Sequence, residues 1–170
     1  MKNIFQVIII ILIFNNHLIA EENKVSQFIA REINDCINCD LSNINFKHTD
    51  LSNANMSGSI FVNTTFHRAN LKGANFSDTE LFSVNLNKTN LIMANFNNAK
   101  IYDSMMYEAN LSKSSFQNAY LERVKSQKSV YTASNMHNII IQNSNFQDAQ
   151  ISSAIFSNAK ISNTDFTNVN

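Results

Sequence analysis

A five-residue period governs this sequence from residue 39 to residue 170. Counted from Leu41, every fifth residue is apolar, and Ser126 is the one polar exception among 26 positions. Nine of the thirteen Phe residues fall on this phase. A period of five matches neither the 3.6 residues of an α-helix turn nor the two-residue alternation of a β-strand. The chain must therefore turn once per unit, which is typical of a repeat architecture.

A second phase, two residues before the first, holds small or β-branched residues. It includes Ala54, Ala69 and Ala74, and only Ile44 and Ile139 are larger. The other three phases are mostly Asn, Ser, Lys, Asp and Gln. Two residues of each unit are therefore expected to point inward and three outward.

The repeated unit resembles that of the pentapeptide-repeat family, in which Ala, then Asp or Asn, then Leu or Phe, precede two variable residues. It appears here as Ala54-Asn55-Met56, Ala69-Asn70-Leu71, Ala74-Asn75-Phe76, Ala94-Asn95-Phe96 and Ala109-Asn110-Leu111. The resemblance implies an all-β fold, a right-handed quadrilateral β-helix whose coils each take twenty residues. Residues 39–170 would form about six and a half coils, stacked ~4.8 Å apart.

One outward phase is rich in Asn and Gly, the residues that most readily accept a positive φ. We expect the chain to turn at these positions: Asn43, Asn53, Gly58, Asn63, Gly73, Asn98, Asn118, Asn138, Asn143 and Asn158.

Residues 1–20 have the layout of a signal peptide. Lys2 precedes a mainly apolar run over residues 4–14, and Ala20 offers a cleavage point. The run is shorter than the ~20 residues that span a bilayer. The layout predicts a bacterial protein that is exported to the periplasm or secreted, with no transmembrane span in its mature chain. An uncleaved N-terminal anchor is the alternative.

An open strand edge at the end of a solenoid promotes aggregation, so the first coil needs a cap. Residues 21–38 are predicted to form that cap. Val25, Phe28, Ile29 and Ile33 have helical spacing and indicate an amphipathic helix over residues 24–34. The repeat continues to residue 170 without a corresponding cap, so we expect a homodimer through the C-terminal coil.

Cys36 and Cys39 lie on interior phases where the cap meets the first coil. A disulfide between them fits an oxidising compartment, and two buried thiols packing as apolar groups are the alternative. Redox catalysis would need a βαβ context, and zinc would need two further ligands; neither is seen nearby.

The pattern weakens over residues 122–132, where Ser126 occupies a core position. A serine there leaves either a void or a polar group that needs a partner. The segment predicts a bulge or a looser coil, which is either a ligand contact or hinge, or a decayed repeat.

The sequence contains no recognisable catalytic, cofactor-binding or metal-binding constellation. His48, His67 and His137 all fall on outward phases. Acids and bases pair along the coils as surface ladders, with Glu80 over Lys100 and Asp103 over Arg123. A binding or structural module without cofactors is expected, not an enzyme.

Folding the sequence into coils of twenty residues separates four unequal sides. One exposes a candidate interaction face of apolar and aromatic residues, although strands in any sheet favour such residues: Ile60, Val62, Phe82, Tyr102, Tyr120 and Ile140. The next side is basic, with Glu108 interrupting the series Lys47, His48, His67, Arg68, Lys88, Lys125 and Lys128.

The candidate face favours binding to a protein or an envelope component. The basic side offers an alternative, binding to nucleic acid or to an anionic surface. Some pentapeptide-repeat proteins mimic DNA and protect a topoisomerase, which requires a strongly acidic rod. Residues 39–170 contain nine acids and ten bases, so neither DNA mimicry nor a nucleic-acid partner is expected.

Overall fold

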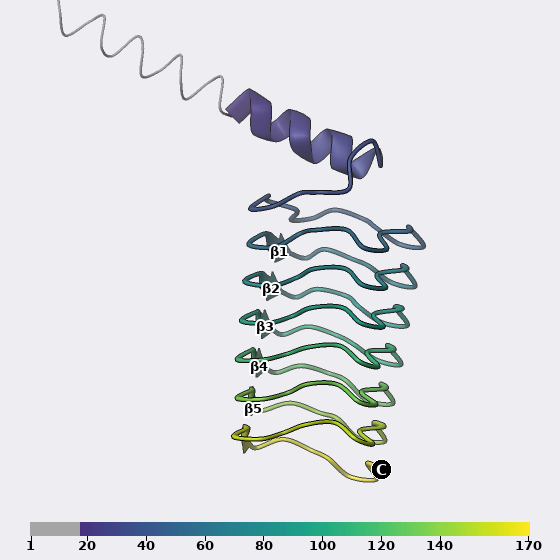
Figure 1. Cartoon of the computed structure of the whole chain (residues 1–170), viewed down its shortest axis with the longest axis vertical. Helices are drawn as coiled ribbons and strands as arrows, with labels where there is room; N and C mark the ends of the chain where they lie inside the picture. Colours follow the sequence, from purple (N-terminus) through teal and green to yellow (C-terminus); the bar gives the residue numbers. More distant parts are fainter. Residues whose placement is uncertain (1–17) are drawn as a thin grey trace, which may run out of the picture.

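The computed structural model describes residues 18–170, which form a helix followed by a parallel β-solenoid (Figure 1). Six short strands stack in chain order into one sheet. They are β1 (Ile60–Val62), β2 (Glu80–Phe82), β3 (Lys100–Tyr102), β4 (Tyr120–Glu122), β5 (Ile140–Gln142) and β6 (Lys160–Ser162). Each residue pairs with the residue twenty positions later, as Ile60 does with Glu80. The predicted coil of twenty residues is therefore confirmed.

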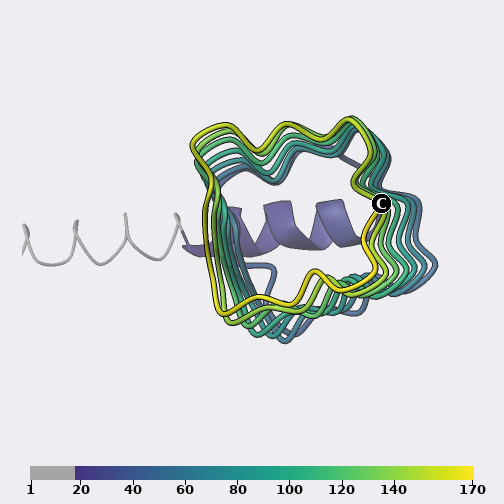
Figure 2. The same cartoon turned by 90° about the horizontal axis from the view of Figure 1, so that it is seen from below.

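Seen along its axis, the solenoid has four sides (Figure 2). The strand side carries β1–β6. The basic side is formed by the units centred on Phe46, Phe66, Leu86, Met106, Ser126, Phe146 and Phe166. The mixed side is formed by the units centred on Leu51, Leu71, Leu91, Leu111, Tyr131 and Ile151, and the amide side by those centred on Met56, Phe76, Phe96, Phe116, Met136 and Phe156. Isolated bridges such as Asn45↔Thr65 keep the same offset of twenty on the other sides.

Every fifth residue from Asn38 to Asn168 has a positive φ, between 48° and 69°. The expected Asn and Gly positions are among them, but so are Lys88, Met93 and Glu108. L-residues are strained in this conformation, and β-branched residues most of all. From residue 38 to residue 168, no Val, Ile or Thr occurs at this phase. The absence of β-branched residues is therefore the sequence signal that marks the turn.

The interior is a stack of side chains repeated at the coil spacing. Phe76, Phe96 and Phe116 are fully buried, and their rings are stacked with centroids 4.8 Å apart at each step. Such stacking adds to the stabilisation from apolar burial. The small residues of the second phase, such as Ala74 and Ala94, are also buried and let each corner close.

The helix covers the N-terminal end of the solenoid, but its bounds differ from the prediction. Within the described residues it spans 18–29, whereas 24–34 was expected. Arg31 adopts a positive φ of 63°, which ends the helix, and bridging to the first coil begins at Asp35. Phe28 is fully buried with its ring edge-on to Phe46 at 6.0 Å, whereas Ile29 is 44% exposed. The expected inward position of Ile29 was therefore wrong.

Cys36 and Cys39 are joined by a disulfide where the chain enters the first coil. Both residues are buried, and Ser59 holds the segment from the coil beneath. Its hydroxyl donates to the Cys36 carbonyl at 2.7 Å and accepts from the Cys39 N–H at 3.0 Å. The predicted signal peptide lies mainly outside the described residues; residues 18–20 belong to the helix.

The bulge predicted around Ser126 is absent, and that prediction was wrong. The bridges Met105↔Lys125 and Lys125↔Asn145 keep the register on both sides of this unit. Tyr131, one unit later in an otherwise aliphatic column, fills the space that Ser126 leaves. Its phenol oxygen lies 2.6 Å from the Ser126 hydroxyl, and both residues are fully buried. The serine and the tyrosine compensate each other in volume and in hydrogen bonding.

The coil of residues 151–170 has interior-phase residues that are more exposed than those of the coils above it. Ile161, for example, is 44% exposed, and a shallow apolar hollow of about 230 Å³ is lined by Ile151, Phe156, Ile161, Phe166 and Val169. Self-association through this coil stays a prediction.

Candidate protein-binding face

The strand side presents two columns of outward side chains, one from each end of the three-residue strands. The first residues of β1–β6 form one column: Ile60, Glu80, Lys100, Tyr120, Ile140 and Lys160. The third residues form the other: Val62, Phe82, Tyr102, Glu122, Gln142 and Ser162. Backbone pairing fixes the spacing within each column, so the sheet serves as a rigid support for these side chains.

Three aromatic residues on this side form a continuous row, which we call the aromatic row: Phe82, Tyr102 and Tyr120. The rings of Phe82 and Tyr102 are stacked, with centroids 4.9 Å apart and planes 6° apart. Tyr120 stands in the other column, and its ring lies 5.5 Å from that of Tyr102 at 46°. All three side chains are half-buried by their neighbours and keep one surface toward solvent.

The six residues of the predicted face share the strand side and belong to both of its columns. Val62 is paired with Phe82 and extends the aromatic row toward the N-terminus, and Ile140 is paired with Tyr120 and extends it toward the C-terminus. Ile60 is 45% exposed, and Glu80 and Lys100 separate it from Tyr120 within its column.

Charged residues beside the aromatic row pair with one another. Lys100 and Glu80 form an ion pair at 3.0 Å, and Arg123 binds both oxygens of Asp103, at 2.6 and 2.9 Å. The hydrogen bond from Arg123 holds the pKa of Asp103 below its ordinary value. The two predicted ladders are confirmed. Exposed ion pairs of this kind each contribute only ~0–1 kcal/mol, so they neutralise the face more than they stabilise the fold.

Sequence reasoning missed the part that Glu122 has in this face. Its carboxylate accepts a hydrogen bond from Tyr120 Oη at 3.0 Å and also contacts Arg123. The Tyr120 hydroxyl lies 3.2 Å from Gln142 Oε1 as well. The hydrogen bond to Glu122 raises the pKa of Tyr120 above its ordinary value. Stepping twenty residues from Tyr102 to Glu122 would have placed this carboxylate beside the aromatic row.

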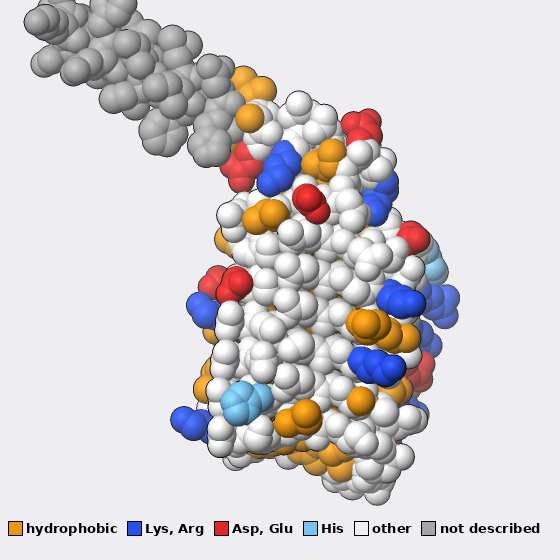
Figure 3. Space-filling view, in the orientation of Figure 1, with side chains coloured by type: hydrophobic (Ala, Val, Ile, Leu, Met, Phe, Trp, Pro, Cys, Tyr) orange, Lys and Arg blue, Asp and Glu red, His pale blue; other side chains and the backbone are white. Residues whose placement is uncertain are grey.

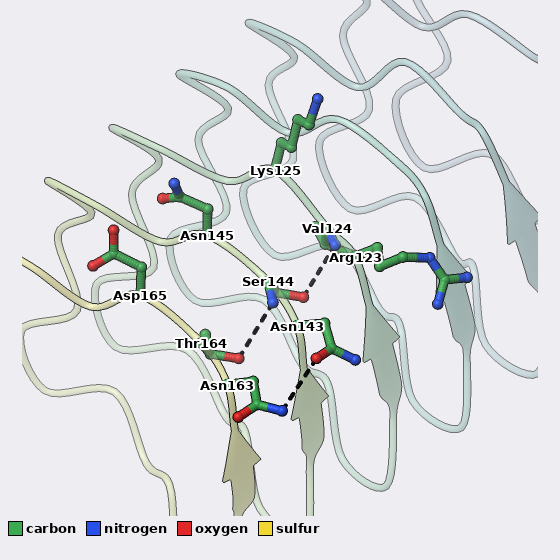
Figure 4. Close-up of a pocket in the computed structure, with 9 residues that line it drawn as sticks. All are labelled: Arg123, Val124, Lys125, Asn143, Ser144, Asn145, Asn163, Thr164 and Asp165. Atoms are coloured by element: carbon green, nitrogen blue, oxygen red, sulfur yellow. Dashed lines mark hydrogen bonds between the residues drawn. The ribbon is translucent and has the colours of Figure 1, made fainter.

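A groove of about 540 Å³ runs along the corner between the strand side and the basic side (Figure 4). Small residues make its floor, where Val124 N–H donates to Ser144 Oγ at 3.0 Å and Ser144 N–H to Thr164 Oγ1 at 3.4 Å. Its rims carry polar and charged groups: Arg123, Asn143 and Asn163 on one side and Lys125, Asn145 and Asp165 on the other. The groove adds hydrogen-bonding groups next to the C-terminal end of the aromatic row.

The other sides differ clearly from this one. Figure 3 shows a band nearly free of charge and apolar groups running down the rod. On the amide side, Asn55, Asn75 and Asn95 form a ladder in which each Nδ2 donates to the Oδ1 of the preceding coil, at 3.0 and 3.1 Å. These amides bond mainly to one another, so they are less available to a partner than the edges of the aromatic row.

The described part of the chain, residues 18–170, gathers no three His, Cys, Asp or Glu side chains that could hold a metal ion. Nor does it contain a helix with the length and apolar character needed to cross a bilayer.

These observations define residues 18–170 as a parallel β-solenoid preceded by one short helix. The model of the family called pentapeptide repeats matches residues 39–78, 79–118 and 132–170, with eight copies. The chain therefore belongs to the pentapeptide repeat family, whose members are typically structural or binding modules. The match omits residues 119–131, the segment around Ser126.

Several solved structures are similar to this chain at low sequence identity. A pentapeptide repeat protein of the Arabidopsis thaliana thylakoid lumen is 24% identical, with a TM-score of 0.53, covering 59% of this chain and 67% of its own. HetL from the cyanobacterium Nostoc is 16% identical, with a TM-score of 0.44, covering 85% and 92% of the two chains. QnrB1, a plasmid-mediated fluoroquinolone resistance protein, is 17% identical, with a TM-score of 0.40, covering 80% and 76%. A comparison with curated proteins gives no match.

Proposed function

We propose that this protein is an exported, non-catalytic module that binds a protein partner through the aromatic row on its strand side. The observation that carries the proposal is the stacked pair Phe82 and Tyr102, continued by Tyr120, on a rigid parallel sheet. Tyrosine is enriched among the residues that dominate binding energy at protein interfaces. These rings are already ordered by their neighbours, so little side-chain entropy would be lost when a partner binds.

The surroundings of the aromatic row favour a protein over a small molecule. The row lies along the outer surface of the sheet, whereas small molecules usually bind in concave sites. Paired charges on both flanks and the polar corner groove give the strip a hydrogen-bonding border. An apolar centre with a polar border is the usual anatomy of a protein interface.

A non-catalytic role is proposed because the best nucleophile–base pair of the described residues lacks supporting groups. His137 Nδ1 lies 2.7 Å from Ser157 Oγ on the amide side. Serine catalysis also needs a group that orients the histidine, and donors for the oxyanion. Within residues 18–170, no carboxylate hydrogen-bonds to the other ring nitrogen of His137. The pair is better understood as a surface contact between neighbouring coils.

Export is proposed from the layout of residues 1–20, and the buried disulfide between Cys36 and Cys39 agrees with it. Disulfides persist in oxidising compartments such as the periplasm and the extracellular space. The nearly balanced charge of residues 39–170 supplies no polyanionic surface, so mimicry of DNA is not part of the proposal.

A crosslinking pull-down from the native envelope fraction tests the proposal. Wild-type protein is compared with Phe82→Ser/Tyr102→Ser and with the control Gln117→Ser, which alters the amide side. We expect the double variant to lose partner recovery by at least about tenfold, as for a truncated aromatic hot spot, and the control to retain it. Equal recovery with all three correctly folded proteins would reject the aromatic row as the binding site.

A further inference from the structure

The N-terminal half of the basic side concentrates positive charge within three consecutive coils. Lys47 and His48 lie on the first, His67 and Arg68 on the second, and Lys88 on the third. The bridges Asn45↔Thr65 and Thr65↔Asn85 hold these coils in register. The rings of His48 and His67 meet edge to face, with centroids 6.3 Å apart.

Little negative charge offsets this cluster. Lys88 pairs with Glu108 on the next coil at 3.3 Å. Within the part of the chain that the structure describes, Lys47 and Arg68 take part in no ion pair. Lys47, His48 and Arg68 are exposed, and His67 is half-buried between them. The cluster is therefore free to meet an external anion.

Further along the same side, apolar and aromatic groups lie among more cations. Met105 is 37% exposed, and Lys128 Nζ lies over the ring of Tyr107, 5.9 Å from its centroid. Lys125 stands in the column of Met105, one coil on. Basic residues interspersed with aromatic and apolar ones are typical of surfaces that rest on a membrane interface.

We propose that the basic side rests against an anionic phospholipid membrane, and that this binding strengthens at lower pH, when His67 is protonated between its neighbouring cations. Lys47, Arg68 and Lys88 stand on the same side of three successive coils, so they can meet lipid phosphates together, whereas Asp148 and Asp165 lie toward the C-terminal end of that side. Single-stranded nucleic acid is less well matched, because its binding relies on aromatic rings open for base stacking and Lys128 covers the Tyr107 ring.

The pH dependence follows from the groups that face His67. Burial lowers its pKa, and the nearby charges of Arg68, His48, Lys47 and Lys88 lower it further. Lipid phosphates would offset the repulsion from these cations and make protonation of His67 easier. Because coupling between two ligands is reciprocal, an anion that favours protonation must itself bind better to the protonated protein. The direction is therefore tighter binding at lower pH.

Co-sedimentation of the full chain with vesicles tests the proposal. Vesicles of phosphatidylcholine alone are compared with vesicles that also contain phosphatidylglycerol, so that any contribution from the apolar N-terminal segment is common to both. Each Lys or Arg near an anionic surface strengthens binding about fivefold. Lys47→Gln/Arg68→Gln/Lys88→Gln should therefore weaken binding to the anionic vesicles on the order of 100-fold.

A matched control removes the same charge from other sides of the rod. Lys72→Gln/Lys113→Gln/Lys160→Gln should bind anionic vesicles within about threefold of wild type. His67→Gln should retain the wild-type affinity at about pH 7.5 and lose the increase seen at about pH 5.5, on the two sides of the ordinary histidine pKa of about 6.5.

Three results would overturn the proposal. The first is an equal loss of affinity for anionic vesicles in the two triple variants, which would show that only the net charge of the protein matters. The second is equal binding to neutral and anionic vesicles. The third is tight binding to single-stranded RNA or to inorganic polyphosphate without binding to the anionic vesicles. None of these results bears on the aromatic row, which lies on a different side.

Discussion

The pairing of Ser126 with Tyr131 makes a quantitative prediction about how this core tolerates a missing apolar residue. Tyr131 Oη lies 2.6 Å from Ser126 Oγ and 3.7 Å from the sulfur of Met106, and no part of either residue reaches solvent. Ser126 Oγ also donates to Ser129 Oγ at 3.2 Å, and Ser129 donates to the Met106 carbonyl. The buried hydroxyls therefore form one small network.

Two single substitutions disturb this network in opposite ways. Tyr131→Phe removes one hydrogen bond, which contributes about 0.5–1.5 kcal/mol, and Ser126 keeps its bond to Ser129. Ser126→Leu replaces one oxygen atom by three carbon atoms in space that Tyr131 occupies, and overpacking of a core costs about 1–3 kcal/mol. We expect the free energy of unfolding to fall by about 1 kcal/mol in Tyr131→Phe and by about 2 kcal/mol in Ser126→Leu.

The double variant Ser126→Leu/Tyr131→Leu makes both columns wholly apolar and restores the aliphatic pattern in the column of Tyr131. Its free energy of unfolding should lie within about 1 kcal/mol of wild type, which requires a strong favourable coupling between the two positions. Urea unfolding followed by circular dichroism measures all the variants, with Leu111→Met as a volume-conserving control in the column of Tyr131. The reasoning is refuted if Tyr131→Phe is as stable as wild type, or if the effects of Ser126→Leu and Tyr131→Leu simply add.

Three further predictions address the turn, the histidine cluster and the disulfide. Met93 has a φ of 62°. Met93→Val should therefore lower the free energy of unfolding by about 1–2 kcal/mol, whereas Met93→Asn should not. Equal stability of the two variants in thermal melts would contradict the argument from backbone strain. The pKa of His67 should lie below 6.5 because of burial and nearby cations, and Arg68→Gln should raise it; an NMR titration that shows no rise would remove Arg68 as a cause. The disulfide between Cys36 and Cys39 closes a loop with a sequence separation of 3. Its reduction should lower the free energy of unfolding by about 2 kcal/mol, measured by urea unfolding. An unchanged urea midpoint would show that the bond does not constrain the cap.

The strict register of the sequence explains why much of the fold could be predicted from it. An unbroken period of five residues, together with the coil period of twenty residues, assigns each residue to a side and a coil. Glu80 over Lys100 and Asp103 over Arg123 followed from counting alone. Stacking of Phe82 on Tyr102 could be inferred in the same way, because coils of equal length place residues twenty positions apart next to each other in one column.

The structure differs from the predictions where the packing of particular side chains, not the five-residue period, decides the conformation. The helix could not be bounded from apolar spacing, because the left-handed turn at Arg31 and the bridge at Asp35 decide where it ends. Ser126 was interpreted without regard to Tyr131, although a tyrosine in an aliphatic column was the available signal. The corner groove depends on how small residues such as Ser144 pack where two sides meet. Assigning each residue to one side of the solenoid does not predict the shape of such a corner.

The central claim, that the strand side is the side that meets a partner, is tested most directly by site-specific photocrosslinking in living cells. A photoreactive phenylalanine analogue is placed at Tyr102 in the aromatic row and, in a second protein, at Gln117 on the amide side. We expect a discrete crosslinked protein species from position 102 that is absent from position 117 and is abolished when Phe82→Ser is added. A species that forms equally from both positions, or only from position 117, would contradict it.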